Sequence, residues 1–361
     1  MQLRAPLSLD INVTRECNFH CSFCSATPIG RGLGRDELTL SEIDNIFRYA
    51  DENGVFVVRI AGGEPLVRQD FREIARAASC YSFTKILLTN GSLLDDDKVA
   101  MLSESKFDSV ALSVDGHVPS IHEKSRASPG SFETLLRSVE ILRRGGLPHT
   151  AMVTVTKYNV EWLVEILDLL VSMEFYSVRF LLLAASGKAR HRKALFPDYA
   201  TWSKELLRLT VHIDRTQPLI DYSVLPPHED PIPYELYYPL KQAGRLDLLE
   251  SVWKIRYSTK TAKKIGCAAG QTQMTIFENG DVYGCDLMRD APQWRAGNIR
   301  DSSLDEIWRN SETFTALRSM KKSELGGACG SCSVSICGGG CRASALSTSG
   351  RINGADQTCM L

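Results

Sequence analysis

Short apolar runs alternate with longer segments of helical period along the first half of the chain. The runs are rich in β-branched residues, which is typical of strands in a buried sheet. The predicted strands are residues 7–13, 55–62, 85–91, 109–116, 150–156 and 177–184. Because a helical segment separates each strand from the next, we expect parallel strands joined by right-handed crossovers. The pattern predicts an α/β fold, either an open doubly wound sheet or a partial barrel.

The segments between these runs repeat apolar residues at the spacing of amphipathic helices. The clearest begins after Thr39, a residue type that favours helix N-termini, and ends at Gly54. Similar patterns occupy residues 69–80, 95–106, 131–144 and 159–173. Residues 190–265 show no clear strand alternation, and we expect helices around a proline-rich break there. These helices are predicted at residues 200–214 and 234–258, and the break at 223–233.

The chain from residue 266 onward is dense in Gly and Cys and has few apolar runs. One exception, residues 272–285, predicts a hairpin that turns at Asn279 and Gly280. We expect that such a segment cannot fold around a hydrocarbon core of its own. Metal ligation is therefore expected to supply much of its stability.

The overall composition is that of a globular protein, with 43% hydrophobic and 24% charged residues among 361. A chain of this size can bury one large core or two moderate ones. The formal net charge is −1, which gives no reason to expect nucleic acid or an anionic membrane as partner. No window has the length of a membrane span, and the N-terminus lacks the blocks of a signal peptide. The sequence therefore predicts a cytoplasmic protein.

The eleven cysteines fall into two groups and one single residue. Three lie at residues 17–24, seven lie at residues 267–359, and Cys80 stands alone. A cytosolic protein is unlikely to hold a disulfide framework, because its compartment keeps thiols reduced. We therefore interpret the two groups as metal-rich regions.

The first group, Cys17, Cys21 and Cys24, follows the first predicted strand with the spacing C-x-x-x-C-x-x-C. A zinc site would need a fourth ligand, and the only nearby candidate, His20, adjoins Cys21 and cannot easily complete a tetrahedron. With Phe23 before its last cysteine, the motif resembles the radical S-adenosylmethionine (radical SAM) superfamily. The resemblance implies a partial (βα)6 barrel and a 4Fe-4S cluster on three thiolates. Its fourth iron would bind S-adenosylmethionine, whose cleavage yields a 5′-deoxyadenosyl radical.

Other polar motifs also stand at the ends of predicted strands, where parallel α/β proteins bind ligands. In the family such motifs hold the methionine amino group, the ribose and the methionine carboxylate. The resemblance implies cofactor contacts by Phe23, Gly62, Gly63, Glu64, Asn90, Ser113, Asp115 and Arg126. Asn90 could instead contact substrate. Taken alone, each motif also fits an ordinary turn, a helix cap or a surface position.

The second group of cysteines resembles the SPASM domain, an extension of radical SAM enzymes that carries two auxiliary iron–sulfur clusters. The resemblance assigns Cys329, Cys332, Cys337 and Cys359 to a distal cluster, and Cys267, Cys285 and Cys341 to a proximal one. The gap after Cys332 is four residues where the family usually has five. The stretch before Cys267, KTAKKIG, lacks a cysteine that fully ligated members have there. We expect an open iron, a noncysteine ligand or a 2Fe-2S form at the proximal cluster. The alternative for the whole C-terminal cysteine group is a pair of structural zinc sites, each held by three or four of these thiolates.

Asp286, directly after Cys285, is the candidate catalytic base. Sulfatase-maturating relatives have an Asp at the matching place, proposed to take a substrate proton during two-electron oxidation; orienting the hairpin is the alternative role. For Cys80 we favour a buried structural thiol over a hydrogen-atom donor. Other residues that could meet substrate, or simply pack, are His117, His122, Glu123, Tyr234, Tyr237 and Tyr238.

Together the two resemblances predict three parts: a radical SAM partial barrel at 7–190, a helical bridging region at 191–265 and a SPASM domain at 266–361. The predicted function is hydrogen-atom abstraction from a peptide or small natural-product precursor, completed as an oxidation or crosslink. Alternatives are sulfatase-type protein modification, epimerisation or dehydrogenation of an amino sugar, a porphyrin substrate, and a nonenzymatic iron–sulfur electron carrier.

The expected partners are the substrate and an external electron donor such as flavodoxin or ferredoxin. Relatives that recognise a leader peptide often carry a small N-terminal recognition domain. The first predicted strand begins near residue 7 and leaves no room for one. A separate peptide-recognition protein is therefore expected if the substrate is a peptide.

Overall fold

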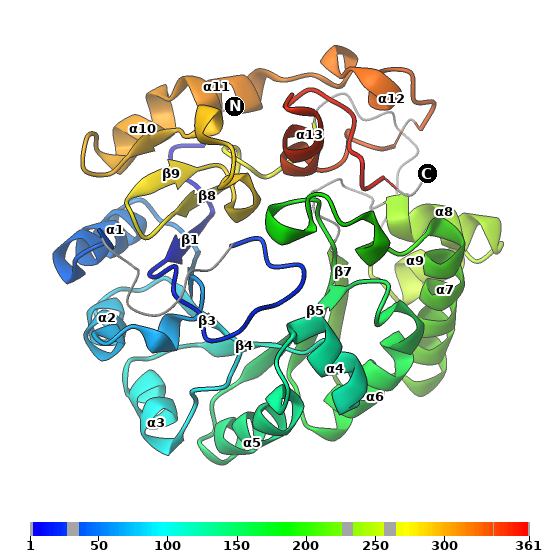
Figure 1. Ribbon diagram of the computed structural model, residues 1–361, viewed down its shortest axis with the longest axis horizontal. Helices are drawn as coiled ribbons and strands as arrows, with labels where there is room; N and C mark the ends of the chain where they lie inside the picture. The colour runs from blue at the N-terminus through cyan, green and yellow to red at the C-terminus, as the bar shows by residue number, and fades with distance from the viewer. Residues whose placement is uncertain (1–2, 27–35, 226–233, 256–264, 335, 360–361) are drawn as a thin grey trace. The chain divides into compact units, whose positions relative to one another are not determined.

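The computed structural model describes residues 3–26, 36–225, 234–255, 265–334 and 336–359 (Figure 1). The chain forms two compact units, each built from segments distant in sequence. Unit 1 comprises Met1–Ser113, Ala127–Thr150 and Ala268–Ser319, and unit 2 comprises Val114–Arg126, Ala151–Cys267 and Met320–Leu361. The three-part division into barrel, bridge and SPASM domain stays a prediction.

Unit 1 is built on a sheet whose strands follow the order β10-β9-β8-β1-β2-β3-β4. The strands are β1 (Ser8–Asn12), β2 (Val57–Ala61), β3 (Thr84–Thr89), β4 (Ser109–Ser113), β8 (Gln273–Ile276), β9 (Asp281–Tyr283) and β10 (Gly297–Asn298). Strands β1 to β4 are parallel, as the sequence predicts. The hairpin prediction is confirmed, since β8 and β9 are antiparallel and Gly280 has a φ of +83° in the turn. Strand β8 also pairs in parallel with β1, with Gln273 opposite Ser8.

The helices of unit 1 include α1 (Leu40–Glu52), α2 (Phe71–Ala78), α3 (Asp96–Glu104), α5 (Ser131–Arg144), α10 (Leu304–Asn310) and α11 (Glu312–Ser319). Helix α1 begins as predicted, because Thr39 caps it and forms a capping box with Glu42. Its buried face contains Ile43, Ile46 and Phe47, at the spacing of one helical stripe.

Helices α10 and α11 correct the expectation that the chain after residue 266 has no hydrocarbon core. Trp308 and Phe314 are fully buried and meet edge to face, with 5.5 Å between their ring centroids. The Trp308 indole N–H also donates to the carbonyl of Leu3 at 3.0 Å. Residues 268–319 therefore fold with the N-terminal strands of unit 1 rather than by metal ligation alone.

Unit 2 contains β6 (Ser177–Leu182), β7 (Asp221–Leu225) and most of β5 (His149–Val155), in the order β5-β6-β7. Its helices include α4 (Pro119–Arg126), α6 (Leu163–Ser172), α7 (Tyr199–Thr216), α8 (Tyr234–Gln242), α9 (Asp247–Ser251), α12 (Gly327–Gly330) and α13 (Arg342–Ser349). The expectation of no strand in 190–265 is wrong, because β7 pairs in parallel with β6, Asp221 lying opposite Ser177. The predicted proline-rich break overlaps this strand, and its remainder lies outside the described residues.

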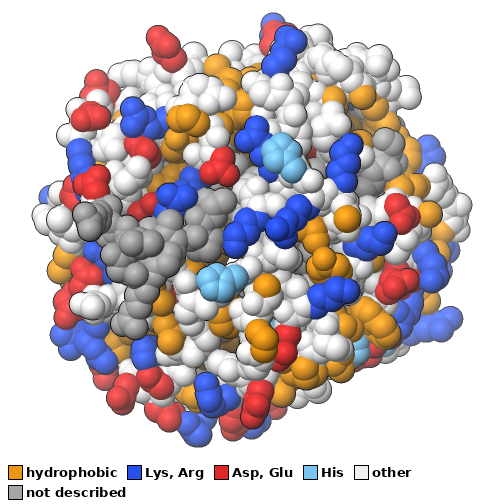
Figure 2. Space-filling view, in the orientation of Figure 1, with side chains coloured by type: hydrophobic (Ala, Val, Ile, Leu, Met, Phe, Trp, Pro, Cys, Tyr) orange, Lys and Arg blue, Asp and Glu red, His pale blue; other side chains and the backbone are white. Residues whose placement is uncertain are grey.

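Figure 2 shows acidic and basic side chains interspersed around the edge of the viewed face, in keeping with a formal net charge of −1. Several Lys and Arg side chains gather near the middle of that face. Among the described helices, none combines the length and apolar character needed to cross a membrane.

Candidate functional site

The three N-terminal cysteines lie in a loop that directly follows β1. Cys21 is buried, whereas Cys17 and Cys24 are half-buried. The loop folds on itself, because the Phe19 N–H donates to the Cys17 sulfur at 3.4 Å and the Cys24 N–H donates to the Cys21 carbonyl at 3.4 Å. Phe23, the aromatic of the motif, is buried. One short loop therefore holds all three predicted ligands of the first cluster.

The surroundings of Cys17 disfavour a free thiolate. Burial is the main cause that raises the pKa of Cys17 to about 12; the negative charges of Glu64, Cys21 and Cys24 contribute to this rise, and the hydrogen bond from the Phe19 N–H opposes it. A cationic iron centre offsets both burial and repulsion, because thiols bind metals in their deprotonated form. The donor set thus fits an iron–sulfur cluster.

The GGEP motif packs against the segment that leads into this loop. The Gly63 N–H donates to the Thr14 carbonyl at 2.8 Å, and the Glu64 N–H donates to the Glu16 carbonyl at 2.7 Å. A Cβ atom on Gly63 would lie 2.1 Å from the Glu16 oxygen, and one on Gly62 would lie 2.4 Å from the Thr14 oxygen. Both glycines are therefore required for the close approach of two backbones. Their predicted contact with the methionine amino group stays a prediction.

Glu64 joins GGEP to the loop after β3. It is fully buried, and its Oε1 accepts bonds from Thr89 Oγ1 at 2.7 Å and from the Leu66 N–H at 3.1 Å. Its Oε2 accepts the Asn90 N–H at 2.7 Å. Burial raises the pKa of Glu64, although these bonds favour the charged form. The carboxylate thus orders two loops at the carboxyl ends of neighbouring strands.

Asn90 in turn reaches the cysteine loop. Its Nδ2 donates to Asn18 Oδ1 at 2.9 Å, and Asn18 Nδ2 donates to Ser92 Oγ at 2.7 Å. Asn18 lies between Cys17 and Cys21 but was not predicted as a site residue. The only feature of the sequence that could have pointed to Asn18 is that it is a polar residue between two cysteines of the motif. Asn90 therefore supports the cysteine loop through its hydrogen bond to Asn18.

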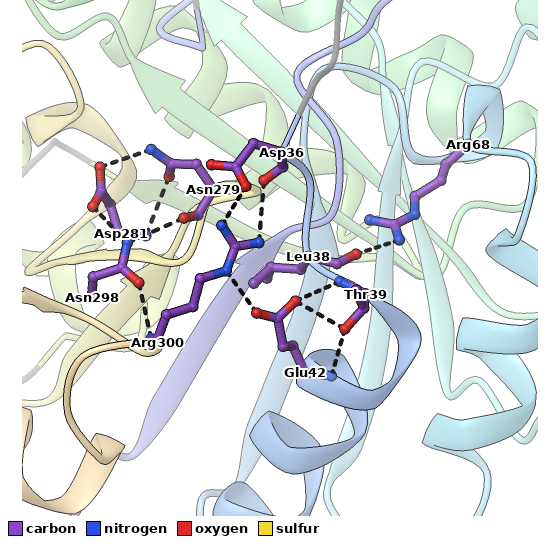
Figure 3. A network of polar contacts seen from close by, with 9 residues as sticks. All are labelled: Asp36, Leu38, Thr39, Glu42, Arg68, Asn279, Asp281, Asn298 and Arg300. Atoms are coloured by element: carbon purple, nitrogen blue, oxygen red, sulfur yellow. Dashed lines mark hydrogen bonds and ion pairs between the residues drawn. The ribbon is translucent and has the colours of Figure 1, made fainter.

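Two arginines, neither predicted from the sequence, hold the chain where it enters and leaves the cysteine loop (Figure 3). Arg68 donates to the Val13 carbonyl at 2.6 Å. It also donates to the Leu38 carbonyl at 2.5 Å, the contact drawn in Figure 3. Arg300, which follows β10, donates to Asp36 at 2.6 Å and to Glu42 at 2.7 Å. The Arg300 bond is the main cause that lowers the pKa of Glu42 to about 2. Arg300, far from α1 in the sequence, thereby anchors the start of that helix.

Within unit 2, Asp115 and Arg126 form a buried ion pair. Arg126 Nε lies 2.8 Å from Asp115 Oδ2, and the Thr154 N–H donates to Asp115 Oδ1 at 2.8 Å. Burial raises the pKa of Asp115, and Arg126 opposes this shift. Ser113, at the end of β4 in unit 1, is half-buried. The predicted contacts of these three residues with cofactor stay predictions.

His122, one of the residues predicted to meet substrate or to pack, lies on helix α4, so its expected place in a loop after the fourth strand is wrong. It is buried, and its Nδ1 accepts the Asp115 N–H at 3.2 Å. Burial, with a smaller effect of Arg126, lowers the pKa of His122 to about 3. The imidazole is therefore neutral at physiological pH and orients the Asp115 backbone.

The four predicted distal ligands line one pocket in unit 2. Its wall consists of Tyr234, Lys322, Cys329, Cys332, Val334, Cys337, Gly339, Gly340, Asp356 and Cys359. Cys332 and Cys359 are exposed, and the other two cysteines are half-buried. Across the described ranges, no three Cys, His, Asp or Glu side chains meet the geometry of a single-ion site. The convergence of four thiols on one pocket fits a cluster in which each thiolate binds a different iron.

Of the predicted proximal ligands, Cys267 and Cys341 lie in unit 2 and Cys285 lies in unit 1. Burial raises the pKa of Cys341 to about 12, and the nearby Asp356 and Cys267 add to the shift. Most of the KTAKKIG stretch lies outside the described residues. The fourth ligand therefore stays a prediction.

Asp286 begins a short 3-10 helix, η5 (Asp286–Met288), directly after Cys285. It is half-buried, and burial raises its pKa to about 6, with the Asp10 carboxylate adding to the shift and Arg59 opposing it. Asp10 pairs with Arg59 at 2.8 Å and accepts a bond from Gln273 at 3.0 Å. Asp10 and Arg59 were not predicted, because only the pairing of β1, β2 and β8 brings them together. A carboxyl group of this pKa suits proton transfer near neutral pH.

Cys80 contradicts the prediction of a buried structural thiol. It is exposed, in the turn that follows α2. The buried face of that helix is formed by Phe71, Ile74, Ala75 and Ala78. Because Cys80 lies beyond the last helical residue, the helical spacing no longer places it on this face.

Comparisons with known proteins agree with both cysteine motifs. The profile of the radical SAM superfamily matches residues 11–170, and that of an iron–sulfur cluster-binding domain named SPASM matches residues 267–333. The chain is 28% identical to the AdoMet-dependent heme synthase of Methanosarcina barkeri, over 96% of this chain and 94% of that protein. It is also 28% identical to the mycofactocin maturase MftC of Mycobacterium tuberculosis, over 99% of this chain and 84% of that one.

A solved structure shares the fold at lower identity. Streptococcus suis SuiB bound to S-adenosylmethionine matches with a TM-score of 0.75 and 19% identity, covering 99% of this chain and 78% of SuiB. At this identity the likeness speaks for the fold alone. It supports the α/β architecture with parallel strands that the sequence predicts.

Proposed function

Since the chain belongs to the radical S-adenosylmethionine superfamily and carries a SPASM domain, we propose that it abstracts a hydrogen atom from a peptide or natural-product precursor. It is an enzyme that uses S-adenosylmethionine and iron–sulfur clusters. When bound and reduced, the first cluster supplies the electron that cleaves S-adenosylmethionine to a 5′-deoxyadenosyl radical. We propose a net oxidation or crosslink as the outcome.

The observation that carries this proposal is the support around the cysteine loop. Cys17, Cys21 and Cys24 lie in one loop, and the backbone of GGEP is hydrogen-bonded to the residues before it. Asn90 binds the same loop from a neighbouring strand end. The chain thus braces the one loop that carries all three cysteines, which favours a cluster with one iron left for a second ligand.

We propose that Asp286 takes a proton from the substrate after hydrogen abstraction. Its neighbour, Cys285, is a proposed cluster ligand, so proton and electron would leave the substrate toward the same segment of the chain. The Asp10 carboxylate raises the pKa of Asp286, and the Arg59 guanidinium lowers it. Asp10 and Arg59 also pair with each other.

A peptide substrate is supported by the names of similar proteins, which include a mycofactocin maturase and a PqqA peptide cyclase. A porphyrin is the second candidate, because similarity to a heme synthase extends over 94% of that protein. Sulfatase-type modification, amino-sugar epimerisation or dehydrogenation, and a nonenzymatic electron carrier remain alternatives. We propose flavodoxin or ferredoxin as electron donor and a separate recognition protein for a peptide substrate.

The test is anaerobic reconstitution with iron and sulfide, reduction with dithionite, and quantification of 5′-deoxyadenosine. We expect cleavage of S-adenosylmethionine by the wild-type protein. Absence of cleavage under strict anaerobiosis, with the clusters assembled, would refute the proposal. Mass spectrometry with a candidate precursor peptide in one arm and a porphyrin in the other then separates the two substrate classes.

A further inference from the structure

Arg342 is a fully buried cation in the C-terminal cysteine region. It is the first residue of α13 and directly follows Cys341. Its Nη1 donates to the carbonyls of Ile352 and Gly354 at 3.0 and 2.8 Å. Its Nη2 donates to the carbonyl of Gly339, and its Nε donates to that of Gly340 at 3.5 Å. The guanidinium therefore joins the Cys337–Cys341 loop to the segment before Cys359.

No carboxylate in the described part of the chain forms an ion pair with this side chain. The nearest acidic residue along these loops, Asp356, is engaged elsewhere: it accepts the Cys341 N–H at 2.7 Å and the Thr358 N–H at 2.9 Å. A guanidinium keeps its charge in proteins, and a buried charge without a counter-ion is costly. Carbonyl dipoles alone stabilise a cation less than an opposite charge does. Among the described residues the fold therefore holds a buried positive charge that makes no direct ion pair, while the Asp356 carboxylate is bound to backbone N–H groups.

The carbonyl partners of Arg342 lie next to the predicted cluster ligands. Gly339 and Gly340, whose carbonyls bind Arg342, line the pocket of the four distal cysteines, and Cys341 is a proposed proximal ligand. Clusters ligated by thiolates are anionic, and their reduction potentials depend on the net charge nearby and on burial. A buried cation favours the reduced form, which carries one more negative charge.

We propose that Arg342 is a positioning residue whose buried charge raises the reduction potential of the auxiliary clusters and makes them better electron acceptors. The inference rests on the proposed presence of those clusters but not on the identity of the substrate. Its hydrogen bonds hold the ligand loops, and its charge acts on the electrons that the substrate releases.

The test separates charge from hydrogen bonding with Arg342→Gln, which removes the charge, and Arg342→Lys, which keeps it. Arg351→Gln is the control, because Arg351 lies just past the end of α13 and is exposed, so that water screens its charge. Each change is made in full-length protein that also carries Cys17→Ala, Cys21→Ala and Cys24→Ala. Only the auxiliary clusters then contribute to redox titrations followed by electron paramagnetic resonance.

We expect Arg342→Gln to lower the midpoint potential of the auxiliary clusters, while Arg342→Lys and Arg351→Gln leave it near the reference value. Equal potentials in all variants would overturn the proposal. So would equal loss of auxiliary-cluster iron in the Gln and Lys variants, because Arg342 would then serve folding alone. The titration requires no cleavage of S-adenosylmethionine, so its outcome is independent of the cleavage assay that tests the proposed function.

Discussion

The N-terminal and C-terminal cysteine groups are positioned in different ways. Around the loop of Cys17, hydrogen bonds from GGEP, Asn90 and Arg68 fix the backbone before any metal binds. The four cysteines of the distal pocket instead lie on the wall of that pocket, and two of them are exposed. The first arrangement is built by strand ends of an α/β sheet, whereas the second depends on loops with little regular structure. We infer that the N-terminal site is more preorganised and that the C-terminal site depends more on its metal.

The sharpest test of this comparison removes one ligand from each group. We expect Cys17→Ala to abolish cleavage of S-adenosylmethionine, because the open iron requires all three thiolates. Cys329→Ala should leave much of the cleavage but lower the iron content by one cluster. Both are measured as 5′-deoxyadenosine formed and iron bound per chain, with Cys80→Ala, an exposed thiol, as control. Equal loss of cleavage in both variants would contradict independent sites.

Asp286→Asn should separate cleavage from product formation. The amide cannot accept the substrate proton, so product is expected to fall by about 10²- to 10⁴-fold while uncoupled 5′-deoxyadenosine formation remains. Asp290→Asn is the matched control, since Asp290 is exposed in the same segment. The readout is product and 5′-deoxyadenosine in the same reaction, once a substrate is known. Retained product would assign Asp286 to orientation of the hairpin.

Gly63→Ala tests the preorganised backbone directly. The new Cβ would lie 2.1 Å from the Glu16 carbonyl oxygen, so the loop must shift, at a cost of about 1–3 kcal/mol. We expect lower occupancy of the first cluster and weaker binding of S-adenosylmethionine, with the auxiliary clusters retained. Gly146→Ala is the control, because a Cβ there meets no atom within 4 Å, although its positive φ carries some strain. If both substitutions had the same effect, the close approach would not be the cause.

Arg300→Gln should have the smallest effect, because Asp36 is exposed and the Arg300 side chain is partly exposed, at 71% and 31%. We expect a loss of about 0.2–1 kcal/mol of stability at pH 7. The pKa of Glu42 is lowered from 4.5 to about 2, so its stabilisation is fully present above 4.5 and is lost as pH falls toward 2. The difference in Tm between wild type and variant should therefore shrink between pH 5 and pH 3. A constant difference over this range would exclude the ion pair with Glu42 as its source.

The sequence predicted those features that local patterns determine. Thr39 and the apolar stripe of α1 were enough to predict that helix. Six runs rich in β-branched residues were enough to predict the strands β1 to β6. Cysteine spacing likewise singled out residues that the structure brings together in one loop and in one pocket, and their role as ligands stays a prediction. Strand β7 was missed, since its few residues include Asp221, Tyr222 and Ser223 and carry no clear alternation.

Features that depend on tertiary pairing could not be predicted. Arg300 meets Asp36 across 264 positions of the chain, and Asp10 meets Gln273 across 263. Arg342 has no sequence signal, because its proposed role depends on complete burial among carbonyls of two separate segments. Cys80 was assigned wrongly, since a helical pattern does not show where the helix ends.

The parallel pairing of β8 with β1 bears on how the protein can be divided. A fragment ending before residue 267 would retain the cysteine loop but lose the strand that covers the other side of β1. The backbone N–H and C=O groups of Ser8, Leu9 and Asp10 would then face solvent along an open sheet edge. Open edges of this kind recruit strands from other molecules and lead to aggregation. This N-terminal fragment is therefore a poor choice for separate expression, and studies of its predicted cluster are better made by cysteine substitution in the intact chain.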